Sequence, residues 1–470
     1  MSSPSGPGAG QAAAPQRGRG LDGRRQALLQ TTRQALERQD LAPLVPVLNR
    51  QHASDLAQLF RNIDERQQQQ VLQILAEPLA ADVLAEMDTA LRLEVAEGLD
   101  ESLLSDLVEE MEPDDAADVL GGLSEEQSQK ILGMMGPAEA DEVRGLLVHP
   151  EDTGGGIMTP RLVSLREDQT VRDAIQQLHQ RAEEEEDIAC LYAVDADGAL
   201  VGVIPLKRLL LNPPSTPLGA LMRRDPISVR TDDDQEEVAR VFTEYNLLAL
   251  PVVDDMGRLV GRVTADDIVD IIQEEATEDI YGMAAIVSSA LEASSVTGIM
   301  RRRLPWLLVC LIGTLLSGLV LDAFSQTLVQ AGALVLFVPA IMAMGGNTGS
   351  KTSTVTVRSL ATGHLQSGQT GMAILKEVRI ALGMGKFFGV LVFAAAYVWT
   401  GSPAIAACVG LAMLAAVVLS AGLGAVVPLL FRSLGIDPAV ASGPLITTLN
   451  DAISLLIYFS IAVHLLERWG

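Results

Sequence analysis

The chain has 470 residues, with 34 Lys and Arg against 60 Asp and Glu and a formal net charge of −26. From Arg301 on there are 10 basic and 5 acidic residues, which leaves 24 basic and 55 acidic residues, a net −31, in the first 300. This acidic part repels phosphates, so bulk electrostatics exclude a nucleic-acid binder. Three dispersed cysteines and five dispersed histidines argue against a disulfide framework or a zinc site. No phosphate-binding loop, nucleophile–base pair or metal-hydrolase motif supports an enzyme.

Residues 1–22 are rich in Gly, Pro, Ala and Ser, which is typical of a disordered tail and not of a signal peptide. Between residues 23 and 150 apolar positions recur at spacings of three and four, which predicts helices. Met87-Asp88 is echoed by Met111-Glu112, each after an acidic helix rich in Leu and Val. A weak repeat of roughly two dozen residues predicts an all-α helical superhelix.

Residues 151–275 contain two copies of one α/β pattern. The copies begin at Ile157 and Leu221, and each continues with a helix, an apolar strand and Gly-x-Leu-Val-Gly. This pattern resembles tandem cystathionine-β-synthase-type (CBS) domains. CBS pairs are regulatory and sometimes bind adenosine nucleotides, so the resemblance makes ATP a candidate ligand, although no residue here requires a nucleotide. An acidic insertion at 183–187 is expected to be a solvated loop, with ion attraction as the alternative.

An acidic stretch follows the second CBS copy and reads as one helix. Like charges at spacings of three and four repel each other, and bound cations would relieve that repulsion. Residues 276–300 are predicted to form a connecting helix. The carboxylates of the stretch are Asp266, Asp267, Asp270, Glu274, Glu275, Glu278 and Asp279.

The last part, residues 301–470, is predicted to be an all-α membrane domain. Five apolar segments are each long enough for a transmembrane helix of about 20 residues. Arg301, Arg302 and Arg303 precede the first segment, whereas the loops on the other side carry no Lys or Arg. The acidic N-terminal region is therefore expected in the cytoplasm and the C-terminus outside. The five segments lie near 304–324, 329–357, 378–399, 404–430 and 439–466.

Asp451 lies well inside the fifth apolar segment. A lone carboxylate there costs roughly a few kcal/mol or more, so it should face water, an ion or a partner. Thr447 and Thr448 precede it by four and three residues and are expected on the same helix face. The alternative is a carboxyl that is protonated or paired with Lys351 of the second segment.

The second segment carries Pro339 and the run Gly345-Gly346-Asn347-Thr348-Gly349. Three glycines and an asparagine inside a membrane helix favour local unwinding, which is tolerated where the backbone lines a cavity. Freed carbonyls and the Asn347 amide oxygen would suit a hard cation or its water shell. The alternative is close helix packing through small residues.

Together these segments resemble the MgtE magnesium transporter family over nearly the whole chain after the tail. The resemblance implies a homodimer in the plasma or inner membrane, with a pore between protomers and Mg²⁺ moving down its electrochemical gradient. Asp451 matches the family's pore-selectivity carboxylate. Lys351 stands where the family usually has Gln, and a cation there would lower flux or shift selectivity unless it points away. The implied pathway residues are Asp451, Thr447, Thr448, Asn347, Gly345, Gly346 and Pro339.

The resemblance also places regulatory Mg²⁺ among the cytoplasmic acids and near the membrane mouth, where the last helix is expected to begin at Asp437. High cytoplasmic Mg²⁺ would then relieve the repulsion among the acids, compact the acidic domains and close the pore by a population shift. The connecting helix at 276–300 would be the element that plugs or opens the pore. For each acid, a solvated surface carboxylate is the alternative. The candidate ligands are Asp114, Asp118, Glu236, Asp267, Asp270, Glu275, Glu278, Asp279 and Asp437.

Two other functions remain open from the sequence. One is a transporter of Co²⁺, Ni²⁺ or Mn²⁺, against which the lack of Cys or His near the predicted pore argues. The other is a nucleotide-sensing membrane protein that transports nothing. Proton coupling through a neutral Asp451 is a further open variant of the transport mechanism.

Overall fold

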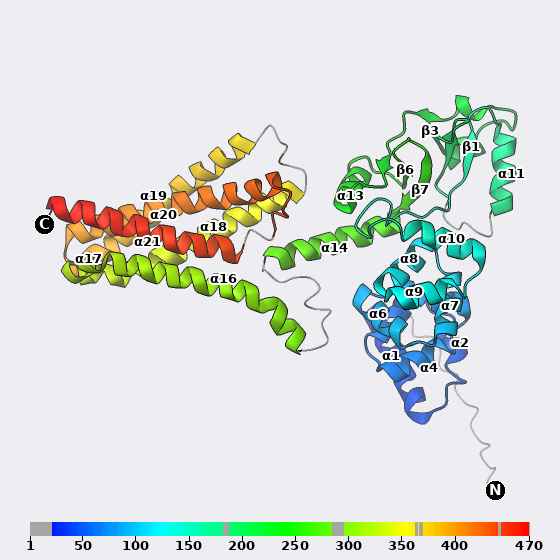
Figure 1. Cartoon of the computed structure of the whole chain (residues 1–470), viewed down its shortest axis with the longest axis horizontal. Helices are drawn as coiled ribbons and strands as arrows, with labels where there is room; N and C mark the ends of the chain where they lie inside the picture. Colours follow the sequence, from blue (N-terminus) through cyan, green and yellow to red (C-terminus); the bar gives the residue numbers. More distant parts are fainter. Residues whose placement is uncertain are drawn as a thin grey trace, which may run out of the picture. The chain divides into compact units, whose positions relative to one another are not determined.

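The computed structural model describes residues 21–181, 188–283, 296–361, 365, 370–439 and 443–469. It separates into two compact units, each described by itself below. One unit comprises the N-terminal helices and most of the CBS pair, ending at Ala265. The other comprises residues 236–246 and everything from Asp266 on, including the membrane helices (Figure 1).

The N-terminal helices form the predicted superhelix. Helices α3, α5, α7 and α9 contact one another in succession, and so do α4, α6, α8 and α10. Met87, Met111 and Met135 recur every 24 residues, and all three are buried. The helices are α1 (Leu21–Arg38), α2 (Val45–Leu48), α3 (Ala53–Phe60), α4 (Glu65–Leu72), α5 (Glu77–Ala85), α6 (Thr89–Gly98), α7 (Glu101–Glu110), α8 (Pro113–Gly122), α9 (Glu125–Leu132) and α10 (Pro137–Leu146).

Some of the acidic residues in this superhelix cap helices. Asp64 accepts a hydrogen bond from the Gln67 backbone N–H at 2.9 Å and forms a capping box at the start of α4. Asp88 caps α6 in the same way, by accepting from the backbone N–H of Leu91 at 3.1 Å. These carboxylates satisfy backbone donors and face the positive end of the helix dipole. Part of the negative charge is thus structural.

Both CBS copies adopt the predicted α/β arrangement. The first has a sheet of order β1-β2-β3-β4 and the second a sheet of order β5-β6-β7. In each, the first two strands are parallel and the next pair is antiparallel. The elements are β1 (Ser164–Arg166), α11 (Val171–Arg181), β2 (Cys190–Val194), β3 (Leu200–Pro205), α12 (Leu206–Leu210), η1 (Leu218–Ala220), β4 (Arg223–Arg224), β5 (Val229–Arg230), α13 (Gln235–Glu244), β6 (Ala249–Val253), β7 (Leu259–Thr264) and α14 (Ala265–Met283).

Each CBS copy packs its leading segment on the sheet of the other copy. Met158 leads the first copy, and its Sδ lies 2.6 Å from where a Cβ on Gly261 of β7 would stand. Met222 leads the second copy, and its Sδ lies 2.7 Å from the corresponding position on Gly202 of β3. Only glycine leaves room for these contacts. The conserved spacing of the two Gly-x-Leu-Val-Gly runs is therefore explained by reciprocal packing.

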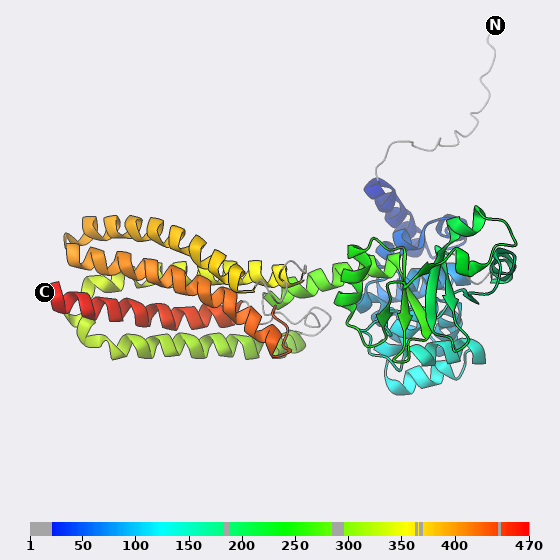
Figure 2. The ribbon, with the colours of Figure 1, turned by 90° about the horizontal axis from the view of Figure 1, so that it is seen from above.

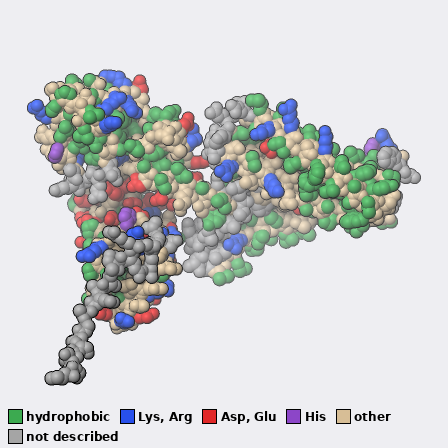
Figure 3. Space-filling view, turned by 180° about the vertical axis from the view of Figure 1, so that it is seen from behind, with side chains coloured by type: hydrophobic (Ala, Val, Ile, Leu, Met, Phe, Trp, Pro, Cys, Tyr) green, Lys and Arg blue, Asp and Glu red, His purple; other side chains and the backbone are tan. Residues whose placement is uncertain are grey.

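The second unit contains five helices, within its described residues, that are long and apolar enough to cross a membrane, which confirms the predicted number (Figure 2). A short helix and a 3₁₀ turn join the first two of them. Hydrophobic side chains cover the face of these helices seen in Figure 3, and acidic side chains are sparse there. The elements are α16 (Val296–Ala323), α17 (Ser325–Gln330), η2 (Gly332–Phe337), α18 (Val338–Ala361), α19 (Thr370–Thr400), α20 (Pro403–Ser433) and α21 (Pro444–Trp469).

Helix α20 is the centre of the bundle. It contacts α18, α19 and α21, while α16 packs against α21. Gly389 of α19 and Gly410 of α20 bring their backbones together, because a Cβ on either would stand within 3 Å of the other's carbonyl oxygen. Tyr458 of α21 donates a hydrogen bond from its hydroxyl to the Leu334 carbonyl at 2.9 Å. Small residues and this buried hydroxyl thus hold the bundle together without a hydrophobic driving force between helices.

Three predictions touch residues that the structure does not describe. The tail at 1–20 and the acidic insertion at 183–187 lie outside the described residues. The predicted connecting helix at 276–300 is described only at its ends, as the last residues of α14 and the first of α16. The acids of the linker do lie on one helix, α14, as expected.

The CBS contacts generate a stability prediction. Gly202→Ala should destabilise the chain by about 1–3 kcal/mol, since the methyl group would overlap Met222 and approach the Arg223 carbonyl. Gly145→Ala in α10 is the matched control, because open space surrounds that position, and it should stabilise by about 0.5–1 kcal/mol. Thermal unfolding of the full chain in detergent measures both. A Gly202→Ala protein as stable as the wild type would contradict the packing described.

Candidate ion pathway and regulatory acids

The glycine run in α18 does not unwind the helix. Helix α18 is continuous through Gly345, Asn347 and Gly349, so the predicted release of backbone carbonyls is wrong. The alternative of close packing holds instead. A Cβ on Gly345 would stand 2.7 Å from the Ser454 hydroxyl oxygen of α21 and 3.2 Å from that of Ser420 of α20. The glycines therefore let α18 approach both neighbours, and side chains must supply any ion contacts.

Asp451 lies where α21 meets α18. It is half-buried, and its Oδ1 lies 4.0 Å from where a Cβ on Gly346 would stand. Thr447, one turn earlier on α21, approaches the same glycine at 3.4 Å through its methyl carbon and is exposed. Asp451 and Thr447 therefore border one edge of α18, as the four-residue spacing predicts.

Thr448 does not lie beside α18 with Asp451 and Thr447. Its side chain packs against Gly313 of α16, so the expectation that both threonines accompany Asp451 holds for Thr447 only. Pro339 is the second residue of α18, where its missing N–H costs nothing. Asn347 and Lys351 are exposed on α18. Within the described residues no ion pair joins Lys351 to Asp451, so that alternative arrangement is not formed in this chain.

Sequence reasoning missed a buried polar layer beside Asp451. Asn450, Ser420 and Ser454 are each at most 2% exposed, between α18, α20 and α21. Asn450 donates from Nδ2 to the Gly345 carbonyl at 3.4 Å. The available signal was the four-residue spacing of Asn450 and Ser454, which puts both on the same side of α21. This layer fixes the rotation of α21 and so the side on which Asp451 emerges.

Comparisons with known proteins agree with these features. A family model described as a divalent cation transporter, MgtE, matches residues 338–461. Models of the MgtE intracellular N domain and of the CBS domain match 51–152 and then 155–213 and 218–274. The magnesium transporter MgtE of Thermus thermophilus is 38% identical over 321 residues, which cover 68% of this chain and 71% of the relative. This chain belongs to the MgtE family.

Other relatives support the same assignment. The magnesium transporter MgtE of Bacillus subtilis is 37% identical over 67% of this chain and 70% of its own length. The crystal structure of the cytosolic domain of the Mg²⁺ channel MgtE in complex with ATP matches 52% of this chain and 99% of that domain, with 36% identity and a TM-score of 0.50. The relatives are named as transporters, which indicates a membrane transporter and not an enzyme.

The candidate regulatory acids of this MgtE chain lie on four elements. Asp114 and Asp118 are four residues apart on α8, and Glu236 is on α13. Asp437 was expected to begin the last helix, but it lies in the connection after α20, because α21 begins at Pro444. Its Oδ1 accepts a hydrogen bond from the Ala439 backbone N–H at 2.8 Å. Among the residues that the structure describes, no three His, Cys, Asp or Glu side chains converge to hold a metal ion. The remaining candidates, on α14, are Asp267, Asp270, Glu275, Glu278 and Asp279.

Asp118 already has a cationic partner inside its own unit, which the sequence did not reveal. Arg92 of α6 is 8% exposed, and its Nη2 lies 3.1 Å from Asp118 Oδ2. Burial raises the pKa of Asp118 by more than Arg92 lowers it, although 44% of the side chain is exposed and water screens the pair in part. Glu151, in the turn after α10, joins the cluster: its side chain is exposed on one side, and partial desolvation and then the Asp118 charge raise its pKa. Asp118 thus pairs directly with the buried guanidinium, whereas Glu151 is influenced by its charge without a direct ion pair to it among the described residues.

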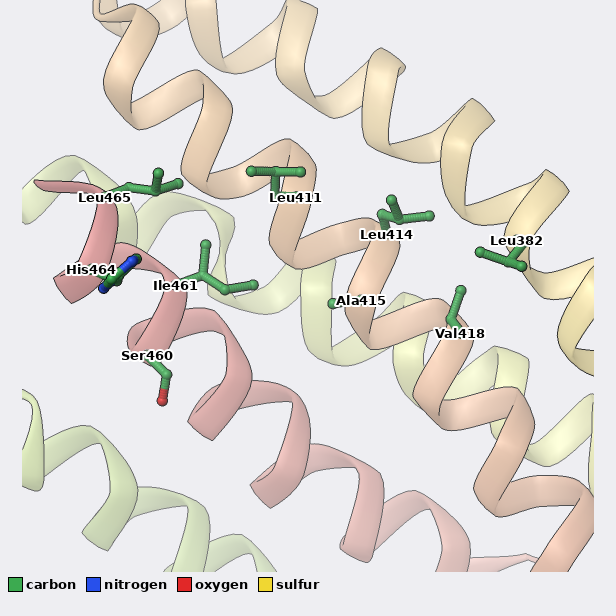
Figure 4. Close-up of a pocket in the computed structure, with 9 residues that line it drawn as sticks. All are labelled: Leu382, Leu411, Leu414, Ala415, Val418, Ser460, Ile461, His464 and Leu465. Atoms are coloured by element: carbon green, nitrogen blue, oxygen red, sulfur yellow. The ribbon is translucent and has the colours of Figure 1, made fainter. Parts of the chain in front are cut away.

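A groove of the MgtE membrane domain lies away from this pathway. It measures about 610 Å³ and lies among α19, α20 and α21, with Leu382, Leu411 and Leu414 in its walls (Figure 4). Ser460 and His464 are its polar lining residues, and Ser460 is nine residues, about 13 Å along α21, beyond Asp451. Its lining residues include one hydroxyl and no carboxylate, so this groove suits a hard cation poorly.

The Arg92 cluster predicts a pH-dependent stability. Glu151 binds its proton more tightly in the folded chain than in the unfolded one, so its ionisation lowers stability as the pH rises through its raised pKa. Glu151→Gln should therefore melt above the wild type at pH 7 in Mg²⁺-free buffer, and the difference should shrink as the pH falls and the wild-type carboxyl protonates. Thermal melts of both proteins from pH 4 to 8 test this. A variant that melts lower at pH 7 would refute it.

Proposed function

We propose that this protein is a homodimeric, magnesium-selective channel or transporter that takes up Mg²⁺ down its electrochemical gradient and closes when cytoplasmic Mg²⁺ is high. The observation that carries the proposal is Asp451, a half-buried carboxylate on a membrane helix with no partner cation among the described residues. A charge at that depth is costly unless it meets water or an ion. Membership of the MgtE family supports the ion's identity.

The chemistry around Asp451 suits a hydrated divalent ion. Mg²⁺ dehydrates reluctantly and usually keeps several waters, so it needs few direct protein ligands. Asp451 offers charge to such an ion, and Thr447 and Asn347, both exposed, offer oxygens to its water shell. In a dimer with the pathway between protomers, each of these groups would occur twice. Because α18 stays helical, recognition would come from side chains and not from backbone carbonyls.

The proposed direction of transport follows from electrostatics. A membrane potential that is negative inside favours entry of a divalent ion by about 4.6 kcal/mol per 100 mV, so no ATP hydrolysis is needed. The positive residues before α16 and near the α18–α19 and α20–α21 connections favour a cytoplasmic N-terminus and a multi-pass protein of the plasma or inner membrane.

The proposed gate is electrostatic. Helix α14 carries acids at spacings of three and four, which repel one another unless cations bind between them. Mg²⁺ bound there would favour a compact, closed state, and its loss would favour an open one, because a ligand shifts the population toward the state that it binds better. The ATP-bound cytosolic domain that resembles the first unit supports ATP as a second ligand of the CBS pair. No residue of this chain is assigned to that nucleotide.

The pathway predicts the effect of removing the charge at Asp451. Asp451→Asn should lower Mg²⁺ uptake roughly 10- to 100-fold, since an interaction with a charged group is lost. Uptake is measured with a fluorescent Mg²⁺ indicator inside vesicles that contain the full chain. Asp322→Asn is the control, because Asp322 is an exposed acid at the far end of α16, and it should transport normally. Undiminished uptake by Asp451→Asn would favour the non-transporting alternative.

The gate predicts a change in sensitivity, not in conduction. Neutralising Asp267, Asp270, Glu275 and Glu278 together should raise the Mg²⁺ concentration needed for closure by about tenfold or more, since those repulsions and ligands are removed. Glu125→Gln with Glu126→Gln, on the first turn of α9, is the control of lost surface charge. Flux is recorded while the Mg²⁺ on the cytoplasmic side is varied. An unchanged closing concentration would place the sensor elsewhere.

A further inference from the structure

One face of α18 is polar and exposed along its cytoplasmic half. Asn347, Lys351, Thr354 and Arg358 follow one another at spacings of three and four, and all four are exposed, whereas the residues between them that face α20 and α21 are mostly buried. At 100° per residue these four positions fall on one side of the helix. A membrane helix does not turn such a face to lipid, because an amide and a charge there are costly.

This polar face begins at Asn347, one residue after the glycine that Asp451 approaches. Gly346 precedes Asn347 on α18, and it is the glycine that Asp451 Oδ1 and Thr447 approach. Lys351 is five residues further along α18, about 7.5 Å along the axis toward the cytoplasmic end. At 100° per residue Lys351 also lies about 140° around α18 from Gly346, so it leaves a different side of the helix from the one that Asp451 approaches, and no ion pair joins the two among the described residues.

We infer that Lys351 lines the proposed ion pathway as a fixed positive charge, which weakens the binding of each cation at Asp451 in proportion to that cation's charge. The inference rests on the proposed function, because it requires ions to pass Asp451. Carboxylates from two protomers would hold a divalent ion tightly, whereas conduction requires binding weak enough for the ion to leave. A positive charge at Lys351 would weaken that binding. Lys351 is thus a residue that determines affinity and selectivity.

Lys386 provides the comparison within the same chain. It is an exposed lysine of α19, flanked by exposed Leu382, Phe387 and Val390, with no polar stripe around it. Helix α19 contacts α20 and lies at the edge of the bundle. This lysine thus lies on a helix that packs on α20, away from the contact of α18 with α21 where Asp451 stands. Lys386→Gln therefore removes the same charge from a different environment.

The test uses the dependence of Coulomb energy on ion charge. Because the repulsion is proportional to valence, a change that strengthens monovalent binding about threefold should strengthen Mg²⁺ about tenfold and a trivalent blocker about thirtyfold. Hexaamminecobalt(III), an inert cation similar in size to hydrated Mg²⁺, serves as the trivalent probe. Lys351→Gln in full-chain vesicles should lower the KM for Mg²⁺ and the blocking concentration in this graded manner. Lys351→Arg and Lys386→Gln should leave both unchanged within about twofold.

A cysteine variant tests the same charge within one folded protein. In a Cys310→Ser background Lys351→Cys is the accessible thiol, since Cys190 and Cys408 are buried. A water-soluble aminoethyl methanethiosulfonate should restore the high KM, and a sulfonatoethyl reagent should lower it below that of the unmodified variant. KM shifts that do not depend on the charge of the reagent, an equal KM shift in Lys386→Gln, or no KM shift at all would overturn the inference.

Asp451→Asn separates the two proposals. If Asp451→Asn transports normally, the proposed pathway itself is wrong. If Asp451→Asn loses transport but Lys351→Gln behaves as the wild type, only the proposed role of Lys351 is refuted.

Discussion

The membrane domain depends on one constraint, which is that a carboxylate inside a bilayer must meet water, an ion or a counter-charge. Asp451 satisfies it neither through an ion pair with Lys351 nor by complete burial. The packing around it keeps the side chain at the edge of the bundle. Asn450, its neighbour in sequence, points inward and bonds to α18, and this fixes the rotation of α21 that brings Asp451 to the outside. The buried amide of Asn450 thus determines, through the rotation of α21, the side on which the Asp451 carboxylate lies.

The continuity of α18 has a consequence for ion recognition. An unwound helix would offer backbone carbonyls at fixed distances, which suits a dehydrated ion. An intact helix offers side chains at its surface and leaves space for water between them. Gly345 instead lets the continuous helix α18 approach Ser454 and Ser420 closely. Recognition through the water shell, the mode that Mg²⁺ favours, is consistent with this geometry.

Much of the fold could be predicted from the sequence, because its signals are periodic. The 24-residue spacing of buried methionines, the duplicated Gly-x-Leu-Val-Gly runs and five long apolar segments each specify an architecture. The last helix begins at Pro444 and not at Asp437, and local signals misled in two further places. The glycines suggested unwinding at Gly345–Gly349, and the three-residue spacing put Thr448 beside Asp451. Both depend on which neighbouring helix covers a given side, and a single sequence does not encode that. For the same reason the Arg92–Asp118 pair, joining residues 26 positions apart, was not predicted.

The reciprocal packing of the CBS copies bears on how such a pair could arise. The groove at Gly261 is filled by Met158 from the other copy, and that at Gly202 by Met222. A chain with a single copy would carry both an empty groove and a loose leading segment, and it could satisfy them only on a second identical chain. An ancestor with one copy would thus have been a dimer of exchanged segments, which gene duplication later joined into one polypeptide.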